Sequence, residues 1–394
     1  METRGRKTGR NIKIFIITLF AFMQLLQTGC WNNRDLAQLS IGTGIGIDKA
    51  GEGRILITVQ IVKPSSAMKK GQGSGTGDKK SVTNVTQVGD SVFEALRDIL
   101  KKVNNKIFLS AAQIIIIGED IARDGVADIL DFFERDHEIQ IKTNIAIAKG
   151  ITARELLEMN SEASEIPAGY IAETLENGDG RAKTIKTMLI DLSKIIEMPG
   201  KQMVIGTVSK NESKTVDAEG TAVFYTDKLV GWLSPEETRG YLFAAGKVKS
   251  TIITFWNPSS PQKRVSVEII RSSSKLGVEW ENGRPVFTIK IKSEGNLADQ
   301  QDGGDLTEKD VLDQCEQELR QQIMRDVEEM LKISQKQCKS DILGFGEIIH
   351  KYHLKYWRGA EANWKEIFSQ TPVKIEVEAK IRRSGLIARP PKPG

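Results

Sequence analysis

Cysteine and histidine are scarce in this sequence, and their scarcity limits both its chemistry and the way it can be cross-linked. The 394 residues include three of each. Cys315 and Cys338 fall within one predicted helix, where a separation of 23 residues corresponds to roughly 35 Å along the axis. A disulfide needs its α-carbons within about 7 Å. We therefore expect both to be free thiols in a fold that does not depend on disulfides.

The few histidines give little support for a metal centre. Glu347 and His350 have the Glu-x-x-His spacing of a di-iron helix, and His350 and His353 could share one helix face. A di-iron bundle also needs matching motifs and carboxylates from its other helices. We favour a plainer interpretation, in which these histidines belong to a polar face beside the aromatic run Tyr352–Trp357. We expect no metal site, and none at His137.

Recognisable nucleotide-binding and nucleophile motifs are also missing. Gly42-x-Gly44-x-Gly46 lacks the GxGxxG spacing, and its glycines alternate with isoleucine in a predicted strand. We expect these glycines to let another element pack closely. Gly240–Lys247 has five residues between its glycines instead of the four of a phosphate-binding loop. No Gly-x-Ser-x-Gly elbow occurs. We expect a protein that is not an enzyme, with no catalytic residues and no cofactor.

Beyond its first thirteen residues, the chain has no excess of either positive or negative charge. The chain has 56 Lys and Arg against 52 Asp and Glu, and the excess lies in the first thirteen residues, which carry five bases and one acid. Residues 30–394 contain 51 of each sign. This balance lacks the electrostatic signature of a nucleic-acid-binding protein. We therefore expect no nucleic-acid partner.

The one long apolar run is too short for a membrane-spanning helix. Ile14–Leu26 has thirteen residues and is interrupted by Thr18 and Gln24, whereas a helix needs roughly 20 residues to cross a bilayer. The run follows a basic segment and ends before small residues, which is the pattern of a secretory signal peptide. We predict a leader over residues 1–29 and export of the chain.

The end of this leader has a further feature. Thr28-Gly29-Cys30 resembles a bacterial lipobox, in which the cysteine receives a diacylglyceryl group and becomes the first residue of the mature protein. Gln27 stands where that pattern prefers leucine, which bears on the efficiency of processing. The resemblance implies a lipid on Cys30, and two acyl chains anchor a protein stably where one is marginal. The alternative is a plain signal peptide followed by a coincidental cysteine.

The rest of the chain indicates an α+β fold with several domains. Residues 30–394 are too many for one typical domain. Alternating and continuous apolar runs predict strands, and patterns of helical period predict helices interleaved with them. Changes of character near Pro199-Gly200 and at Asn257–Pro261 predict three mixed α/β domains. We place them at 30–200 (N-terminal α/β), 201–262 (small middle β/α) and 263–394 (strand meander and long helix).

Individual elements can be predicted within these domains. Ser91–Glu94 and Ser234–Glu237 are capping boxes that start helices. A single helix is expected from Glu119 to Arg135. Three strands at 264–271, 275–281 and 286–293 are expected to form a meander, followed by a helix from Thr307 to Lys339.

Several sequence blocks carry a more specific resemblance. They are Cys30–Leu36, Gly44–Asp48, Gly118–Gly125, Ile129–Asp136, Gly220–Phe224, Lys228–Leu233, Glu237–Gly240 and Asp341–Glu347, with Trp357 and Trp364 downstream. In this order they resemble the C subunit of spore germinant receptors, the Ger(x)C lipoprotein family. The resemblance covers nearly the whole mature chain.

The resemblance has consequences for function. It implies three mixed α/β domains, a lipid anchor on the outer face of the spore inner membrane, and assembly with two integral membrane subunits, A and B. Such a receptor triggers spore germination in response to nutrients. Direct binding of a small molecule by the C subunit stays open. The alternative function is a transporter-associated solute-binding lipoprotein.

Two segments are candidates for contact with partner subunits. One is Leu229–Gly240, in which we expect Trp232 to be exposed, and the other is the aromatic run Tyr352–Trp357. Exposed aromatic and arginine side chains are favoured as interface anchors. Local core packing is the alternative for both segments.

Overall fold

The computed structural model describes residues 15–18, 39–51, 53–62, 82–103, 106–136, 138–159, 165–258, 260–301 and 309–382. Its contacts separate the chain into two units, Met1–Leu39 and Ser40–Gly394. Of the first unit, helical residues 15–18 and Leu39 are described. In the described part of the chain, no helix has the length and apolarity that a membrane crossing requires. All further elements belong to the second unit, apart from the first residue of strand β1.

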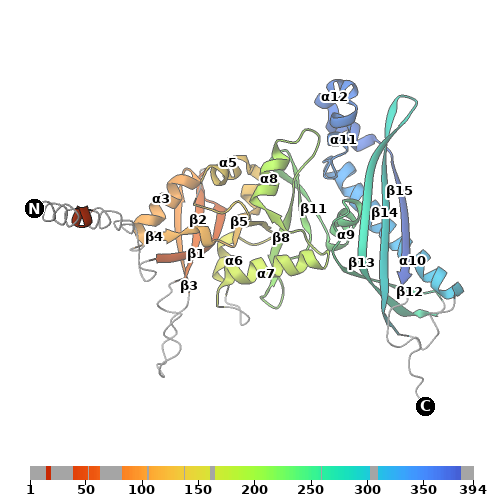
Figure 1. Cartoon of the computed structure of the whole chain (residues 1–394), viewed down its shortest axis with the longest axis horizontal. Coiled ribbons are helices and arrows are strands. Elements are labelled where there is room, and N and C mark those ends of the chain that lie inside the picture. Colours follow the sequence, from red (N-terminus) through yellow and green to blue (C-terminus); the bar gives the residue numbers. More distant parts are fainter. Residues whose placement is uncertain are drawn as a thin grey trace, which may run out of the picture. The chain divides into compact units, whose positions relative to one another are not determined.

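A mixed sheet of eleven strands organises the first half of this unit (Figure 1). Its main path runs β11-β10-β8-β6-β5-β1-β2-β3, with β4, β7 and β9 attached at the side. Strands β1, β5, β6 and β8 pair in parallel, whereas the strands at both ends of the path pair antiparallel. The strands are β1 (Leu39–Lys49), β2 (Ile55–Val62), β3 (Val82–Gly89), β4 (Lys106–Phe108), β5 (Ile114–Gly118), β6 (Asn144–Ala148), β7 (Thr187–Met188), β8 (Val204–Lys210), β9 (Val216–Asp217), β10 (Thr221–Tyr225) and β11 (Lys228–Leu233).

Helices cover both faces of this sheet because its central strands are apolar on both sides. In β5, Ile115 and Ile117 face one core cluster, while Ile114 and Ile116 face another. The sequence of a central strand in a largely parallel sheet is typically a continuous apolar run of this kind. The first cluster includes side chains of α3 (Val92–Lys102), α4 (Glu119–Asp124), α5 (Ala127–Arg135) and α8 (Leu189–Ile196). The second includes those of α6 (Ala153–Glu158) and α7 (Pro167–Gly180).

The alternating glycines of β1 allow α6 and α7 to lie close to the sheet. A Cβ added at Gly44 would lie 2.5 Å from the Cβ of Ala168 in α7, and one at Gly46 would lie 3.2 Å from the Cβ of Ala153 in α6. The prediction that these glycines serve close packing is therefore confirmed.

The single helix predicted from Glu119 to Arg135 is wrong, because two helices, α4 and α5, occupy this range. Gly125 ends α4 with a φ of +139°, a value that L side chains rarely adopt. The next amide, Val126, donates a hydrogen bond to the carbonyl of Asp227 in the β10–β11 turn. This long-range contact changes the direction of the chain at a point where the apolar period of the sequence, taken alone, predicts a continuous helix.

The second half contains a sheet of four strands in the order β12-β13-β14-β15. They are β12 (Thr251–Asn257), β13 (Ser260–Glu281), β14 (Arg284–Gln300) and β15 (Val373–Arg382). Asn257–Pro261, predicted as a linker, contains the turn between β12 and β13, where Asn257 pairs with Ser260. The domain boundaries near residues 200 and 262 stay a prediction.

The meander of three strands is also wrong, because β13 and β14 form one long hairpin. Asn282 and Gly283 at its turn both have positive φ, 50° and 77°, as a two-residue turn of type I′ requires. The serine-rich stretch that we expected to interrupt the first strand stays within β13. There Ser272 forms a hydrogen bond of 2.9 Å with Ser293 across the strand pair.

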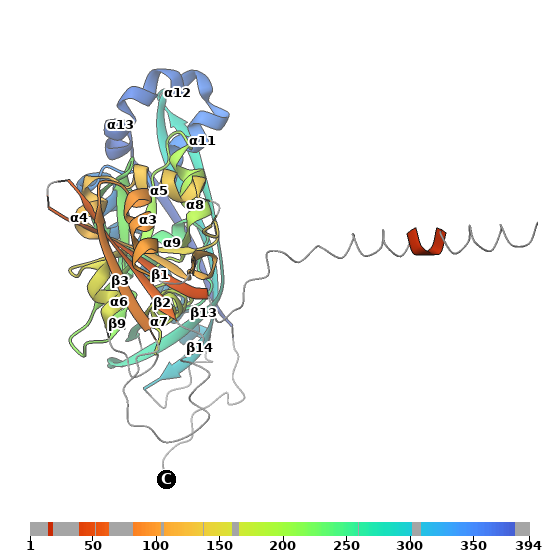
Figure 2. The same cartoon turned by 90° about the vertical axis from the view of Figure 1, so that its left-hand side faces the viewer.

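Helices pack on one face of this sheet and at one end of it (Figures 1 and 2). The predicted long helix is present as α10 (Lys309–Leu331), extended by a π-helix (Lys332–Gln337). It shares a core cluster with the sheet and with α9 (Pro235–Ala244). Shorter helices α11 (Phe345–Tyr352), α12 (Leu354–Ala360) and α13 (Trp364–Gln370) gather near the turn of the β13–β14 hairpin. The α+β class is confirmed, and every clustered core residue lies between Ile45 and Ile381.

Candidate functional site

The residue predicted to carry lipid, Cys30, lies outside the described residues, and so does His137. The other two cysteines are free and buried, as predicted. Burial raises the pKa of Cys315 and of Cys338 to about 11. Both thiols are therefore protonated at neutral pH, and only a thiolate is a good nucleophile or metal ligand.

Buried carboxylates are the usual starting point for an acid–base site, and Asp341 is the most enclosed of them. It accepts hydrogen bonds from the backbone amides of Gly344, Phe345 and Gly346 and from Nε1 of Trp364, at 2.7 to 3.1 Å. Burial raises its pKa to about 6, although these donors favour the charged form. All four donors belong to the start of α11 and to α13, so Asp341 holds this helical region together.

Two further buried carboxylates have similar structural partners. Asp48 accepts hydrogen bonds of 2.8 Å from the amides of Ala153 and Arg154 at the start of α6. Asp326 in α10 pairs with Nε of Arg239 in α9 at 2.6 Å. Burial raises the pKa of both carboxyls. Each acid fixes one element against another instead of facing an open cavity.

His350 and His353 lie among aromatic rings. Across the described ranges, no group of three or more His, Cys, Asp or Glu side chains could hold a metal ion. The ring of His350 lies 5.8 Å from that of Trp357, and His353 lies 5.1 Å from Trp280. The Glu-x-x-His spacing recurs at Glu134 and His137, and the second of these is not described. Both described histidines thus contact aromatic rings, in line with our interpretation.

The first candidate docking segment is mostly core packing. Trp232 in β11 is half-buried against the core of the first sheet, and Nζ of Lys149 lies 5.1 Å from its ring centroid. The expectation that Trp232 is exposed is therefore wrong. Strand β11 pairs antiparallel with β10, and the indole of Trp232 packs against the core beneath them, which keeps it half-buried.

The second candidate segment divides into buried and exposed residues. Trp357 is only 3% exposed and lies 5.2 Å from the ring of Trp364 in the core. Tyr352 and Leu354, in contrast, are 67% and 43% exposed. Local packing therefore explains Trp357, while the residues around the α11–α12 junction remain available to a partner.

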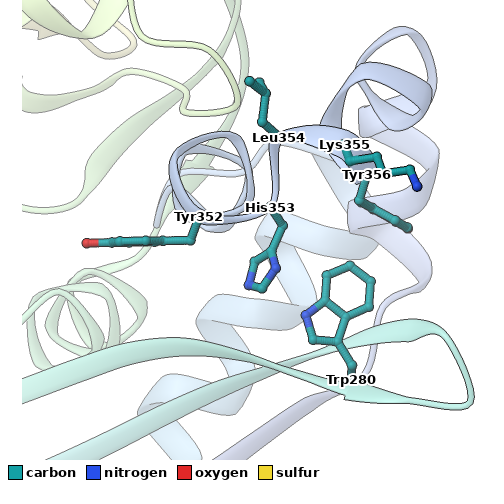
Figure 3. A pocket seen from close by; sticks show the side chains of 6 residues that line it. All are labelled: Trp280, Tyr352, His353, Leu354, Lys355 and Tyr356. Carbon is teal, nitrogen blue, oxygen red and sulfur yellow. The ribbon is translucent and has the colours of Figure 1, made fainter.

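An open hollow of about 630 Å³ lies at this junction, and Figure 3 shows the side chains that line it. The indole of Trp280 comes from the β13–β14 hairpin and meets the rings of Tyr356 at 4.8 Å and His353 at 5.1 Å, both edge to face. Tyr352, Leu354 and Lys355 complete the lining. Sequence reasoning found the helical residues but missed Trp280, because no local pattern connects it to them.

Comparison with known proteins identifies the chain. The family model "Spore germination protein N-terminal domain" matches residues 32–210, and "Spore germination B3/ GerAC like, C-terminal" matches residues 219–385. Each model matches somewhat less than half of the chain, and together they leave few residues unmatched. The chain belongs to the Ger(x)C family of spore germinant receptor C subunits.

Individual members of the Ger(x)C family are similar over their full length. Spore germination protein KC of Bacillus subtilis (strain 168) is 26% identical over 403 residues, which cover 96% of this chain and 98% of that protein. Spore germination protein B3 of the same organism is 27% identical over 373 residues, covering 93% and 97%. The resemblance seen in the sequence blocks is confirmed.

A solved structure supports the fold of this Ger(x)C protein. The crystal structure of the GerBC protein matches with a TM-score of 0.54 and 23% identity, covering 88% of this chain and 99% of that chain. At this identity the likeness shows the fold alone. Family membership gives the chain a role in spore germination, as part of a germinant receptor, and the names of its relatives are those of germination proteins and not of enzymes.

Proposed function

We propose that this chain is the lipid-anchored, non-enzymatic C subunit of a germinant receptor on the outer face of the spore inner membrane. It acts by assembly with integral membrane A and B subunits. The observation that carries this proposal is the match of both family models, one to each half of the chain. A receptor role accounts for a leader, a balanced charge and a large ectodomain together.

The proposed anchor is a diacylglyceryl group on Cys30. The leader, its apolar run and the Thr28-Gly29-Cys30 sequence support it. Two acyl chains keep a protein on a membrane stably. Confinement beside the partner subunits raises their effective concentration, as a tether does, so weak protein contacts suffice for assembly.

The chemistry of the buried groups supports a non-enzymatic role. Asp48, Asp326 and Asp341 are engaged by backbone amides or by Arg239. Burial keeps the two described thiols protonated at neutral pH. These groups stabilise the ectodomain, and the protein surface is left to act through contacts.

Replacement of Cys30 tests the anchor. We expect the full-length wild type, expressed in a spore-forming host, to remain in the membrane fraction and to yield an amino-terminal peptide with the mass of a diacylglyceryl group on Cys30. Cys30→Ala should lose both properties. Cys315→Ala is the matched control, because it removes a buried thiol and should stay on the membrane.

The contrary outcome is equally specific. A wild-type chain that is recovered without lipid, and that begins at a residue other than Cys30, contradicts the anchor. Gln27 would then have prevented processing, and membrane association would rest on protein contacts alone.

A further inference from the structure

The helices α11 and α12 carry a cluster of exposed cations. Residues 350–360 contain Lys351, Lys355 and Arg358 and no acid. All three are exposed, and none of them forms an ion pair with any described residue. Lys351 makes a cation–π contact with Tyr352, 5.3 Å from the ring centroid.

Three lysines of the neighbouring sheet differ from these cations. Lys290, Lys292 and Lys374 are also exposed, and each pairs with a glutamate, at 2.9, 2.9 and 2.7 Å. Cations that have no ion pair within the protein attract an anionic partner. Binding of that partner then breaks no existing ion pair. The α11–α12 region therefore presents three neighbouring cations, Lys351, Lys355 and Arg358, that no described acid pairs.

Exposed aromatic and aliphatic side chains lie among these cations. Tyr352 and Leu354 are 67% and 43% exposed, and Trp280 is 37% exposed. Tyrosine and tryptophan are enriched where proteins meet the headgroup level of a bilayer, because one end of the ring system is apolar and the other polar. Basic residues beside them gain from the negative potential of anionic lipids.

The geometry suits a lipid surface better than a site for a specific small molecule or peptide. The hollow is open, and its lining offers one lysine, Lys355, together with the His353 ring, two tyrosine hydroxyls and one indole N–H (Figure 3). Of the described buried polar atoms that lack a hydrogen-bond partner, none belongs to a residue of this hollow. A bilayer requires charge and apolar area and no fixed set of hydrogen-bond directions.

The surface is also held in place before any partner binds. Trp280 is fixed between the edges of Tyr356 and His353, and the helices are tied down by Asp341 and by the buried Trp357 and Trp364. Leu354 and Arg358 lie one turn apart on the same side of α12, so they can meet one surface together. A preformed surface loses little conformational freedom on binding.

We propose that this aromatic–basic surface, made of Trp280, Lys351, Tyr352, Leu354, Lys355 and Arg358, binds an anionic lipid bilayer. The contact is separate from the proposed lipid on Cys30 and goes beyond the proposed function. It gives the ectodomain a second attachment to the membrane, which restricts how it is turned toward the bilayer.

Vesicle binding by a chain without the anchor tests this proposal. A chain from Trp31 to Gly394 retains every clustered core residue and lacks Cys30. At low salt we expect it to sediment with vesicles of phosphatidylglycerol and phosphatidylcholine in equal parts, and not with vesicles of phosphatidylcholine alone. Binding should weaken as salt is raised to about 0.1–0.2 M, because such salt screens exposed charges.

Two sets of variants locate the contact. Lys351→Gln, Lys355→Gln and Arg358→Gln together should weaken partition onto the anionic vesicles about 100-fold, at roughly fivefold for each charge. Tyr352→Ala with Leu354→Ala should weaken it at least tenfold. All five side chains are exposed, so the variants should keep the thermal unfolding midpoint of the parent chain.

Matched controls exclude general effects of charge and aromatic exposure. Lys247→Gln, Lys263→Gln and Lys275→Gln change the net charge by the same amount at exposed lysines that likewise lack a described ion pair. Trp256→Ala removes a tryptophan that is 54% exposed on β12. Both controls should bind like the parent. Absence of binding to the anionic vesicles, or equal loss in the controls and in the test variants, overturns the proposal. Because no lipid anchor is present, that failure leaves the proposed function untouched.

Discussion

At the scale of single residues, the burial of Asp341 couples folding to pH. Its carboxyl has a pKa of about 6 in the folded protein, above the value near 4 of an unfolded aspartate. The folded state therefore binds a proton more readily than the unfolded state between these values. Stability from this group is highest at low pH and falls as pH rises through about 6.

We expect this dependence to be measurable. Between pH 5 and pH 7 the free energy of unfolding should fall by about 1 kcal/mol more in the wild type than in Asp341→Asn, because asparagine does not titrate. Urea unfolding of the chain from Trp31 to Gly394 at both pH values gives the comparison. The variant should also be less stable at either pH, since an amide cannot accept hydrogen bonds at both of its ends.

Parallel pH profiles for the two proteins would contradict this account of Asp341. Glu219→Gln, which changes an exposed and ion-paired acid, controls for the loss of one carboxylate. It should reproduce the wild-type profile within a few tenths of a kcal/mol, as is usual for exposed pairs.

At the scale of elements, close contacts between backbones decide where helices lie. Gly240 in α9 faces the backbone of α10, and a Cβ at this position would overlap the carbonyl oxygen of Asp326. The ion pair between Arg239 and Asp326 lies at the same crossing. A glycine in the middle of a helix weakens it by up to about 1 kcal/mol relative to alanine, and here the packing of two helices offsets that cost.

Two glycine replacements separate these effects. Gly240→Ala should lower the free energy of unfolding by about 1–3 kcal/mol, as overpacking does. Gly359→Ala in α12, where an added Cβ meets nothing within 4 Å, should raise it by roughly 0.5–1 kcal/mol through helix propensity alone. Denaturant titration of both variants provides the measurement. An unchanged or raised stability for Gly240→Ala would mean that α9 and α10 can separate without cost.

Elements could be predicted from sequence where local chemistry determines them. The capping box at Ser234 and Glu237 is present as predicted, with both reciprocal hydrogen bonds. At Ser91 half of the box forms. The backbone amide of Glu94 donates to the Ser91 hydroxyl, but the Glu94 carboxylate accepts from the backbone amide of Asp90 instead of that of Ser91. The predicted strand of alternating glycine and isoleucine likewise lies in β1.

The errors share one physical cause, which is dependence on distant residues. The break between α4 and α5 requires the carbonyl of Asp227, and the continuity of β13 requires its partner β14. The hollow at α11 and α12 depends on Trp280, which a long hairpin brings from another part of the sequence. Helix α12 itself was missed because an aromatic, basic stretch has no clear apolar period.

At the scale of the whole molecule, contacts connect the regions matched by the two family models. The amide of Gln202, in the region of the first model, donates a hydrogen bond to the carbonyl of Asp341 in the region of the second. Within the second region, Ser340 donates a hydrogen bond to the carbonyl of Phe224 in the first sheet. Gly200 lies so close to Gly346 that a Cβ would not fit between them. These contacts join the sheet of the first half to the helices that carry the aromatic–basic surface.

The proposed membrane attachment and the proposed receptor assembly also concern the whole molecule. A lipid on Cys30 would limit the chain to the membrane plane, and the aromatic–basic surface would limit its orientation there. The remaining surface would then face the A and B subunits in a restricted set of ways, which reduces the entropy lost on assembly.

Recovery of the partner subunits tests the central claim most directly. The full-length chain, tagged at its carboxyl end and produced in sporulating cells, would be purified from detergent-solubilised spore inner membrane, and the co-purified proteins would be identified by mass. The account predicts that the A and B subunits are recovered with it in a constant ratio across independent preparations. A chain that purifies alone from membranes in which both subunits are present would contradict its role as a receptor subunit.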